Sequence, residues 1–536
     1  MGYSKKEFSQ RLASVGIITT IAIGSVLLTT ACSKPADAPT SNSQQSVAPK
    51  AETKENLELL KKVKALLDGE KYDQAKTVVE KMLANDANSA NAHHCLAYIY
   101  HQTEKLDKAI DEYTRALEIN PQEADSWHAR GNSYLKKKLY EKAAIDFSKA
   151  LMIHPAHYTW YLRSCAYLEQ GLYEKAIADA NQSIALNSNY APAYLTKVSA
   201  ERKLGLESEA ATDLAQAKSL KLTDGYQLSI REEFLSEDAD LEAAVTDCTA
   251  IIKLFPMSSD WHYTRARCYL DLEKVKEARA DFDLANKYDP KNDWYDDWAA
   301  TVNNIEYDLS HRAKTPAQQW AIACSSMLFA TNGQGLHSLS GRAFTEENKR
   351  SKQIALEEVW GVSSRVDLLT ALQNLKNNGG HNYLWQTYIK IKKGEIKPGD
   401  VKEVAEDILS GEFKERLAVV SEYGDTFGDR GISAWDLCRY VNLVRGGYLL
   451  GLVSEKEAYD LIMPVAMKIQ QTYSSWEQMN DEYLIGRKFW SHKEWQEDTL
   501  KTTRITKRLL TQKSSPWVAL PWDTDLNCNT KIESSN

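Results

Sequence analysis

The sequence lacks the residue patterns that build metal centres, disulfide frameworks and common hydrolytic sites. It has eight cysteines in 536 residues, irregularly spaced and without a CxxC pair, so neither a zinc site nor a disulfide framework is indicated. GxSxG, HExxH and P-loop motifs are also missing, and we expect no cofactor and no metal. Acidic residues outnumber basic ones by 74 to 66, which argues against nucleic acid as a general partner. No stretch after residue 32 is long and apolar enough to span a bilayer.

The N-terminal residues carry the pattern of an export signal. Lys5, Lys6 and Arg11 precede an uncharged apolar stretch. Small residues then lead to Cys32 in "LLTTAC", which completes the order of a secretory signal. This ending resembles a bacterial lipobox, in which the chain is cut before a cysteine that receives lipid, palmitate included. The resemblance implies a signal peptide over residues 1–31 and lipid attachment at Cys32. An uncleaved anchor and an ordinary signal peptide are the alternatives.

The segment after the signal predicts a tether. Residues 32–55 are rich in Ser, Pro, Ala and Gln and hold few apolar side chains, so they cannot bury enough surface to fold. Ser33 follows the cysteine, where an Asp would imply retention at the inner membrane in enterobacterial sorting. We therefore expect a lipid-anchored protein of the bacterial cell envelope, on the outer membrane and facing the periplasm.

A repeated pattern fills residues 56–291. An Ala is followed by an apolar or aromatic residue, then a small one, then Pro, and the Ala returns at steps of 33 or 34 residues. The clearest copies are Ala109-Tyr113-Ala116-Pro121, Ala143-Phe147-Ala150-Pro155 and Ala278-Phe282-Ala285-Pro290. Weaker copies centre on Ala75, Ala176, Ala210 and Ala244. The pattern resembles the tetratricopeptide repeat (TPR). It implies about seven helix pairs stacked into a superhelical solenoid, because one pair cannot bury its own apolar face.

In the TPR resemblance, the first helix of each pair lines a concave groove that binds an extended peptide or a helix of a partner. The residues at the groove positions are His94, Tyr98, His101, His128, Asn132, Lys136, Tyr161 and Arg202. His94 and His128 lie on adjacent first helices, where a polar groove surface is favoured over a metal site because metal ligands normally lie closer together. The repeats therefore predict a protein or peptide partner.

The second half, residues 292–536, differs in composition, and capping residues indicate where its helices begin. Eleven of the 14 tryptophans follow residue 290, where the repeat register also ends. Thr315, Pro316 and Gln318 form a capping box with its preferred proline. Further helix starts are indicated by Ser364 with Asp367, Ser433 with Asp436, Ser454 with Glu457 and Ser474 with Glu477. We see no convincing run of alternating β-branched residues, so we predict an all-α chain, a TPR solenoid followed by a mostly α-helical globular domain.

One of these helices is "GISAWDLCRYVNLVRGGYLLG", residues 431–451. Ser433 is expected to cap it, with the Asp436 carboxylate reaching back to the Ser433 N–H at the positive helix end. Arg439 lies one turn on and can pair with Asp436. The glycine pair at 446–447 is expected to end the helix. A structural role for Asp436 is favoured over a catalytic one.

Three motifs stand in order in this half: WG at Trp360, AWDxxR at Trp435, and SW…YxxGR from Trp476 to Arg487. Together they resemble a bacterial family of unknown function, domain of unknown function 1266, over about residues 318–500. The resemblance implies a helical fold and names no activity. The residues that can converge as a polar pocket are His381, Asp436, Arg439 and Arg487.

These observations favour an envelope lipoprotein that acts as an adaptor or scaffold. Its TPR groove would bind a protein or peptide, and the helical domain would add a second recognition surface. Two alternatives stay open. One is an enzyme whose site lies around Asp436, Arg439 and Arg487, and the other is a surface lipoprotein that contacts host molecules. The sequence favours binding over catalysis.

Overall fold

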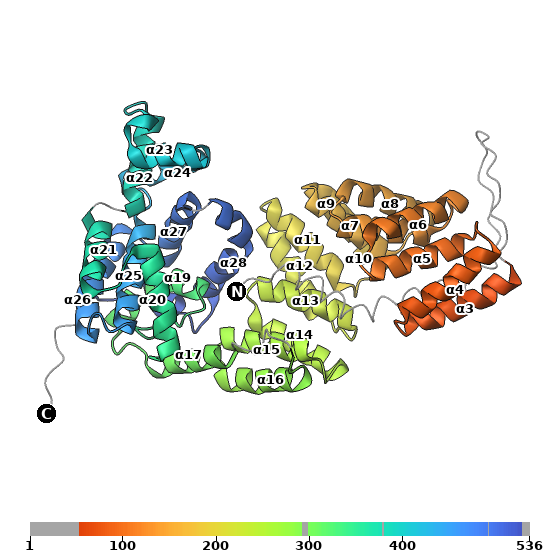
Figure 1. Ribbon diagram of the computed structural model, residues 1–536, viewed down its shortest axis with the longest axis horizontal. Helices are drawn as coiled ribbons and strands as arrows, with labels where there is room; N and C mark the ends of the chain where they lie inside the picture. The colour runs from red at the N-terminus through yellow and green to blue at the C-terminus, as the bar shows by residue number, and fades with distance from the viewer. Residues whose placement is uncertain (1–52, 292–297, 378–379, 491, 528–536) are drawn as a thin grey trace. The chain divides into compact units, whose positions relative to one another are not determined.

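The computed structural model describes residues 53–291, 298–377, 380–490 and 492–527. Within these ranges the chain is helical and holds no β-strand, which confirms the all-α prediction. The chain divides into two compact units after residue 234, and each is described by itself below (Figure 1). The predicted signal peptide, Cys32 and the tether up to residue 52 lie outside the described residues. Among the described residues, no helix is long and apolar enough to cross a membrane.

Helices follow one another in consecutive pairs over residues 54–288 of the described chain. α3 packs on α4, and the same holds for the pairs that begin with α5, α7, α9, α11 and α15. The pairs are α3 (Lys54–Asp68) with α4 (Tyr72–Asn85), α5 (Ala90–Gln102) with α6 (Leu106–Ile119), α7 (Ala124–Lys136) with α8 (Tyr140–Ile153), α9 (His157–Glu169) with α10 (Tyr173–Leu186), α11 (Ala191–Lys203) with α12 (Glu207–Ser219), α13 (Gly225–Glu237) with α14 (Leu241–Leu254), and α15 (Ser259–Asp271) with α16 (Val275–Tyr288).

A left-handed turn residue separates the two helices of every pair. The turn residues have φ between 54° and 74° and follow one another at the spacing of the repeat; they are Glu70, Glu104, Lys138, Gly171, Gly205, Ala239 and Glu273. The N–H of Lys105 donates to the carbonyl of Tyr100 at 2.8 Å. Leu139 donates in the same way to Tyr134 at 2.9 Å. This Schellman closure satisfies the last carbonyls of the first helix and reverses the chain.

The alanine that anchors the repeat is buried in all seven pairs. Ala75, Ala109, Ala143, Ala176, Ala210, Ala244 and Ala278 are each at most 1% exposed. The small side chain lets neighbouring helices approach, and the aromatic residue four positions on, such as Phe147, fills the remaining space. Gly131 completes the approach in the third pair, because an added Cβ would lie 2.8 Å from the Phe147 ring. The packing therefore explains the residues that define the pattern.

An arginine–aspartate pair recurs between first and second helices. Arg130 donates to the two carboxylate oxygens of Asp146 at 2.7 and 2.9 Å, and to the hydroxyl of Thr114 on the preceding second helix at 2.9 Å. The same geometry is repeated by Arg163 with Asp179 and Ser148, and by Arg265 with Asp281 and Thr249. One planar guanidinium thus joins three helices, a task that suits the fork of arginine.

The C-terminal helices pack around α25 (Ser433–Leu449). This helix contacts α20, α21, α22, α26 and α27, and it buries residues on all sides, as a core helix does. The other helices are α17 (Trp298–Ser310), α18 (Pro316–Ala323), α19 (Ser326–Thr331), α20 (Glu346–Trp360), α21 (Arg365–Asn377), α22 (Gly380–Lys392), α23 (Lys402–Ser410), α24 (Phe413–Phe427), α26 (Glu455–Thr472), α27 (Trp476–Trp490), α28 (His492–Thr511) and α29 (Pro516–Ala519), with 3₁₀ turns η2 (Pro398–Asp400) and η3 (Gly428–Arg430).

Most of the predicted helix caps are present. Capping boxes form at Thr315 and Ser454, and the Ser364 hydroxyl accepts from the N–H of Asp367 at 3.2 Å. The predicted Ser474 cap is displaced by one residue, because Ser475 accepts from the N–H of Gln478 at 3.1 Å. Local spacing therefore locates helix starts to within a residue at these sites.

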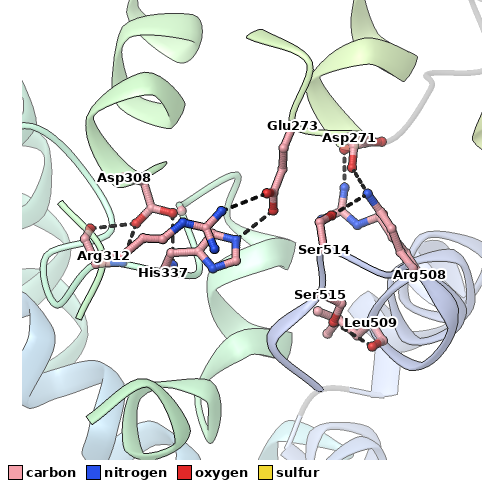
Figure 2. A network of polar contacts seen from close by, with 12 residues as sticks. Asp271, Glu273, Asp308, Arg312, His337, Arg508, Leu509, Ser514 and Ser515 are labelled. Carbon is pink, nitrogen blue, oxygen red and sulfur yellow. Dashed lines mark hydrogen bonds and ion pairs between the residues drawn. The ribbon is translucent and has the colours of Figure 1, made fainter. Parts of the chain in front are cut away.

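Polar contacts tie the last repeat pair to the C-terminal helices within the second unit, as Figure 2 shows. Glu273, in the turn between α15 and α16, lies 2.6 Å from Nε2 of His337 and 3.3 Å from the Arg312 guanidinium. Asp271, at the end of α15, pairs with Arg508 of α28. The last repeat pair therefore shares its unit with the C-terminal helices.

Candidate functional site

The predicted groove positions fall on the first helices, and many of them are buried between neighbouring helices. Nδ1 of His94 lies 2.8 Å from the Ser126 hydroxyl, on the first helix of the next pair. Nδ1 of His101 lies 2.8 Å from the Ser133 hydroxyl in the same way. His128 makes an equivalent contact one pair further on, to a threonine hydroxyl at 3.0 Å. These imidazoles therefore join consecutive pairs.

Hydrogen bonds fix the tautomer of two of these rings. The Ser126 hydroxyl donates to the Glu123 carboxylate at 2.8 Å, and the Ser133 hydroxyl donates to a backbone carbonyl at 3.0 Å. A hydroxyl has one proton, so each serine must accept from the Nδ1–H of its histidine. Nε2 of a neutral ring is then an acceptor. Burial lowers the pKa of His101 to about 3 and the pKa of His128 to about 4. The rings of His101 and His128 are therefore neutral at pH 7.

The other predicted groove residues differ in exposure. Tyr98 and Tyr161 are buried, and the Tyr161 ring packs edge-on against Tyr190 with centroids 5.4 Å apart. The polar positions that keep partial exposure, besides His128, are Asn132, Lys136 and Arg202. The buried side chains hold the first helices together, and the half-buried ones are those that a partner can reach. The part that these residues play in partner binding stays a prediction.

In the C-terminal domain, Asp436 caps a different helix from the one expected. The N-cap of α25 is Ile432, and no side chain caps the N-terminus of this helix from that position. The predicted Ser433–Asp436 capping box is therefore wrong. The Asp436 carboxylate instead accepts from the backbone N–H of His381 at 3.3 Å and of Asn382 at 2.8 Å, in the first turn of α22. A carboxylate is favourable there because the helix N-terminus is the positive end of its dipole.

The start of α25 is capped in return by other helices. The side-chain oxygen of Asn382 accepts from the N–H of Ile432 at 2.8 Å. The buried carboxylate of Glu482, on α27, accepts from the N–H of Ala434 at 3.0 Å. Gly431 leaves room for this exchange, because an added Cβ would lie 2.2 Å from the Asn382 oxygen. The N-termini of α22 and α25 therefore satisfy each other's donors.

Arg439 and His381 lie together among tryptophans. The indole N–H of Trp435 donates to Nδ1 of His381 at 3.2 Å, and the Arg439 guanidinium contacts the same nitrogen. Nδ1 is therefore an acceptor and the ring is neutral, in keeping with burial, which lowers the pKa of His381. The Arg439 guanidinium lies over Trp360 with Cζ 4.3 Å from the ring centroid, and burial lowers its pKa to about 10.

Three of the four predicted pocket residues thus meet. Oδ1 of Asp436 is 3.6 Å from Nδ1 of His381 and 3.7 Å from Nη1 of Arg439. Arg487 is half-buried on α27. Both Asp436 oxygens accept backbone N–H groups and His381 Nδ1 accepts two donors, so these contacts join α22 to α25. Within the part of the chain that the structure describes, no group of three or more His, Cys, Asp or Glu side chains is placed to hold a metal ion.

Arg445 is a fully buried charge on α25, and no role was predicted for it from the sequence. Its five N–H groups are all used, by the carbonyls of Leu339, Ile322, Gly335 and Ser338 and by the Ser325 hydroxyl. The helix runs on through the glycine pair at 446–447 to Leu449, so the predicted end there is wrong. An added Cβ at Gly447 would lie 2.4 Å from Leu368, which shows that this glycine serves close packing. The available signal was an arginine inside the apolar run "VNLVRGGYLLG".

Comparison with known families gives one match in the C-terminal helices and several in the repeats. Residues 355–522 match the family described as "Protein of unknown function (DUF1266)". Tetratricopeptide repeat profiles match residues 97–138, 124–157, 157–190 and 236–293. The chain joins TPR repeats to a DUF1266 region. Both resemblances seen in the sequence are thereby confirmed, and the DUF1266 region contains α25 and the Asp436 cluster.

Two curated relatives from Escherichia coli strain K12 are similar to part of the chain. The uncharacterized protein YbeU is 25% identical over 158 residues, which are 29% of this chain and 65% of that protein. The uncharacterized protein YbeR is 26% identical over 145 residues, 26% of this chain and 58% of that protein. The chain therefore covers less than two thirds of either relative. Among solved structures, a tetratricopeptide repeat protein from Parabacteroides merdae is similar over 45% of this chain and 96% of its own, at 19% identity and a TM-score of 0.34.

Proposed function

We propose that this chain is a lipid-anchored adaptor of the bacterial cell envelope, placed on the outer membrane and facing the periplasm. Its TPR repeats support a general role in protein interaction. The observation that carries the proposal is the row of partly exposed polar side chains on first helices, Asn132 and Lys136 on α7 and Arg202 on α11. The DUF1266 region would add a second recognition surface. The membrane part of the proposal is supported by the signal that ends at Cys32.

The chemistry of this row indicates an extended peptide or a partner helix. The Asn132 amide both donates and accepts, as a peptide backbone requires of its partner. Lys136, which pairs with the Glu104 carboxylate at 3.2 Å, and Arg202 are cationic. Their charges suit a segment that carries acidic side chains or a terminal carboxylate. Packed helices are spaced by about 8–10 Å, so one extended ligand would meet several first helices in turn.

Reversing the two charges of the row, in a Lys136→Glu/Arg202→Glu variant, is expected to reduce partner capture about tenfold or more. Each lost charge-assisted hydrogen bond contributes about 1.5–3 kcal/mol, and the new carboxylates repel an acidic ligand. The measurement is the yield of photo-crosslinked adduct from a crosslinking residue placed at position 132, in the native membrane.

The matched control is Lys149→Glu/Lys221→Glu, which makes the same charge change at two exposed lysines outside the row. It should leave the adduct intact, and both variants should keep the helical circular dichroism of the parent. Equal adduct yields in the two variants would place partner binding elsewhere. An adduct that forms only with host material would favour a surface lipoprotein that contacts a host.

Replacing Cys32 by alanine is expected to release the chain from the membrane or to leave an uncleaved precursor. The thiol is the atom that would receive lipid, and no other residue of the signal provides one. Fractionation and the mass of the N-terminal peptide measure both outcomes. Unchanged processing and unchanged membrane attachment in Cys32→Ala would show that the anchor is not this cysteine.

A further inference from the structure

The sequence motifs of the C-terminal half meet at one guanidinium, that of Arg439 on α25. The tryptophans around it are Trp360 of the WG motif, Trp435 of the AWDxxR motif and Trp490, which follows the SW…YxxGR motif on α27. Cζ of Arg439 lies 4.3, 5.2 and 5.7 Å from the centroids of these three rings. Tryptophans of α20, α25 and α27 therefore gather around a single cation.

Most of the hydrogen-bonding capacity of Arg439 is unused. A guanidinium has five N–H groups, and Arg439 donates through Nη1 to Nδ1 of His381. Oδ1 of Asp436 lies 3.7 Å from the same Nη1, which is too far for a hydrogen bond, and both oxygens of this carboxylate already accept backbone N–H groups. Over the residues that the structure describes, the Nε–H and Nη2–H groups of Arg439 therefore meet no acceptor.

These unused donors are not sealed inside the protein. Arg439 is 9% exposed, and in the described part of the chain its nitrogens do not belong to the polar atoms that are both enclosed and unpartnered. Trp490 is 43% exposed, and its ring meets that of His381 edge-on with the centroids 3.9 Å apart. The unused donors therefore keep contact with solvent, in a cluster whose outermost ring is exposed.

The protein contacts of Arg439 do not offset the cost of burying its charge. Burial lowers the pKa of Arg439 to about 10, although the nearby Asp436 carboxylate acts in the opposite direction. A charged group that is held at such a cost, with free donors beside it, is typical of a site that receives a ligand.

We propose that Arg439 binds the carboxylate of a ligand whose apolar part packs on the exposed ring of Trp490. The Nε–H and Nη2–H groups lie side by side in the guanidinium plane and match the two oxygens of a carboxylate. A carboxylate is favoured over a phosphate dianion, because Asp436 is close and repels a second negative charge more strongly. This inference rests on the proposed function, since it names the ligand chemistry of the second recognition surface.

N-acetylphenylalanine and phenylacetate are the probes, one for the C-terminus of a peptide and one for a free organic acid. Their amides keep the shape and remove the charge. Titration calorimetry of the full-length chain at millimolar probe should show that each acid binds about tenfold or more tightly than its amide, because the amide loses charge-assisted hydrogen bonds. Tighter binding of N-acetylphenylalanine would identify a peptide C-terminus, and tighter binding of phenylacetate would identify a free acid.

Arg439→Met should weaken the binding of both acids about tenfold or more, to the level of their amides. Arg439→Lys keeps the charge but loses the paired donors, so it should recover only part of the affinity. Arg350→Met, at an exposed position of α20, is the matched control and should bind both acids as the parent does.

The proposal is overturned if neither acid binds the parent, if acid and amide bind equally, or if Arg439→Met keeps the affinity of the parent. Trp490→Ala gives a second measurement at an exposed position, which does not depend on the folding of the Arg439 variants. It should weaken both acids several-fold, and an unchanged affinity would also overturn the site. The titration leaves the repeats unaltered, so the adduct at position 132 tests the adaptor role separately.

Discussion

Replacing Arg445 by leucine is expected to lower the free energy of unfolding of the C-terminal unit by about 3–5 kcal/mol, the largest effect that we predict for a single residue. The side chain is completely buried and bonds to five acceptors that lie 106 to 123 residues earlier in the chain, at 2.7 to 3.3 Å. Leucine would remove the donors that the carbonyls of Leu339, Gly335 and Ser338 rely on. The Ile322 carbonyl would keep the N–H and the hydroxyl of Ser325. Burial lowers the pKa of Arg445 to about 9, because the charge loses its solvation inside the protein. The leucine variant no longer carries this desolvation cost. The loss from its unpaired acceptors is larger, so the net effect on the free energy of unfolding is destabilising.

Arg365→Leu is the matched control for this prediction. Arg365 also bonds to a backbone carbonyl and to a carboxylate, that of Glu457, but it does so at the surface. Exposed contacts of this kind contribute about 1 kcal/mol or less. Chemical unfolding followed by tryptophan fluorescence measures both variants. If the two lose the same stability, the five hydrogen bonds of Arg445 do not carry the packing of this unit.

A second buried charge, that of Asp308, contacts the same loop between α19 and α20 that Arg445 contacts. Asp308 of α17 accepts from the N–H of His337 at 2.9 Å and from the N–H of Ser338 at 2.7 Å, while Arg445 takes up the carbonyl of Ser338 at 2.7 Å. Gly335 permits this arrangement, because an added Cβ would lie 2.1 Å from the Asp308 carboxyl carbon. The segment between α19 and α20 has no regular structure of its own over most of its length, and two charges of opposite sign fix its backbone.

The repeat half of the fold was predictable because its causes are local. The alanine spacing, the aromatic residue one turn later and the terminal proline all act within one helix pair. The positive-φ turn recurs even where no glycine marks it, as at Glu104 and Lys138. The pairing of Arg130 with Asp146 is also local, and its 16-residue spacing recurs at Arg163 and Arg265. That signal was present in the sequence and was not used.

The candidate site in the C-terminal domain was predictable only in part. The spacing of Ser433 and Asp436 indicates a capping box, but Asp436 caps a helix that begins more than 50 residues earlier in the chain. A local rule cannot choose between a donor three residues away and one that folding brings close. The same limit applies to Arg445, whose partners come from distant segments. Sequence identified the charged residues of α25, and tertiary packing decided what each of them binds.

Asp436→Asn is expected to destabilise the C-terminal unit by about 2–4 kcal/mol, and Arg439→Met by less than about 1 kcal/mol. Asparagine keeps one acceptor and turns an NH₂ group towards a backbone N–H of α22, so one buried donor loses its partner. Methionine at position 439 removes a buried charge and keeps an apolar stem against Trp360, while Asp436 retains its two backbone donors. The order of the two effects therefore tells whether the carboxylate acts mainly as a helix cap or as one half of an ion pair.

Equilibrium unfolding of both variants and of the double variant measures this order. The control is Asp367→Asn, which changes a capping carboxylate at the exposed start of α21 and should cost less than Asp436→Asn. If Arg439→Met costs as much as Asp436→Asn and the double variant costs no more than either, the ion pair rather than the cap holds the two helices. If Asp436→Asn melts at or above the parent temperature, Asp436 is not a structural residue, because a buried cap cannot be removed without loss. The cluster with His381 and Arg439 would then hold a charge that folding does not require, which is the behaviour of a residue kept for catalysis or ligand binding.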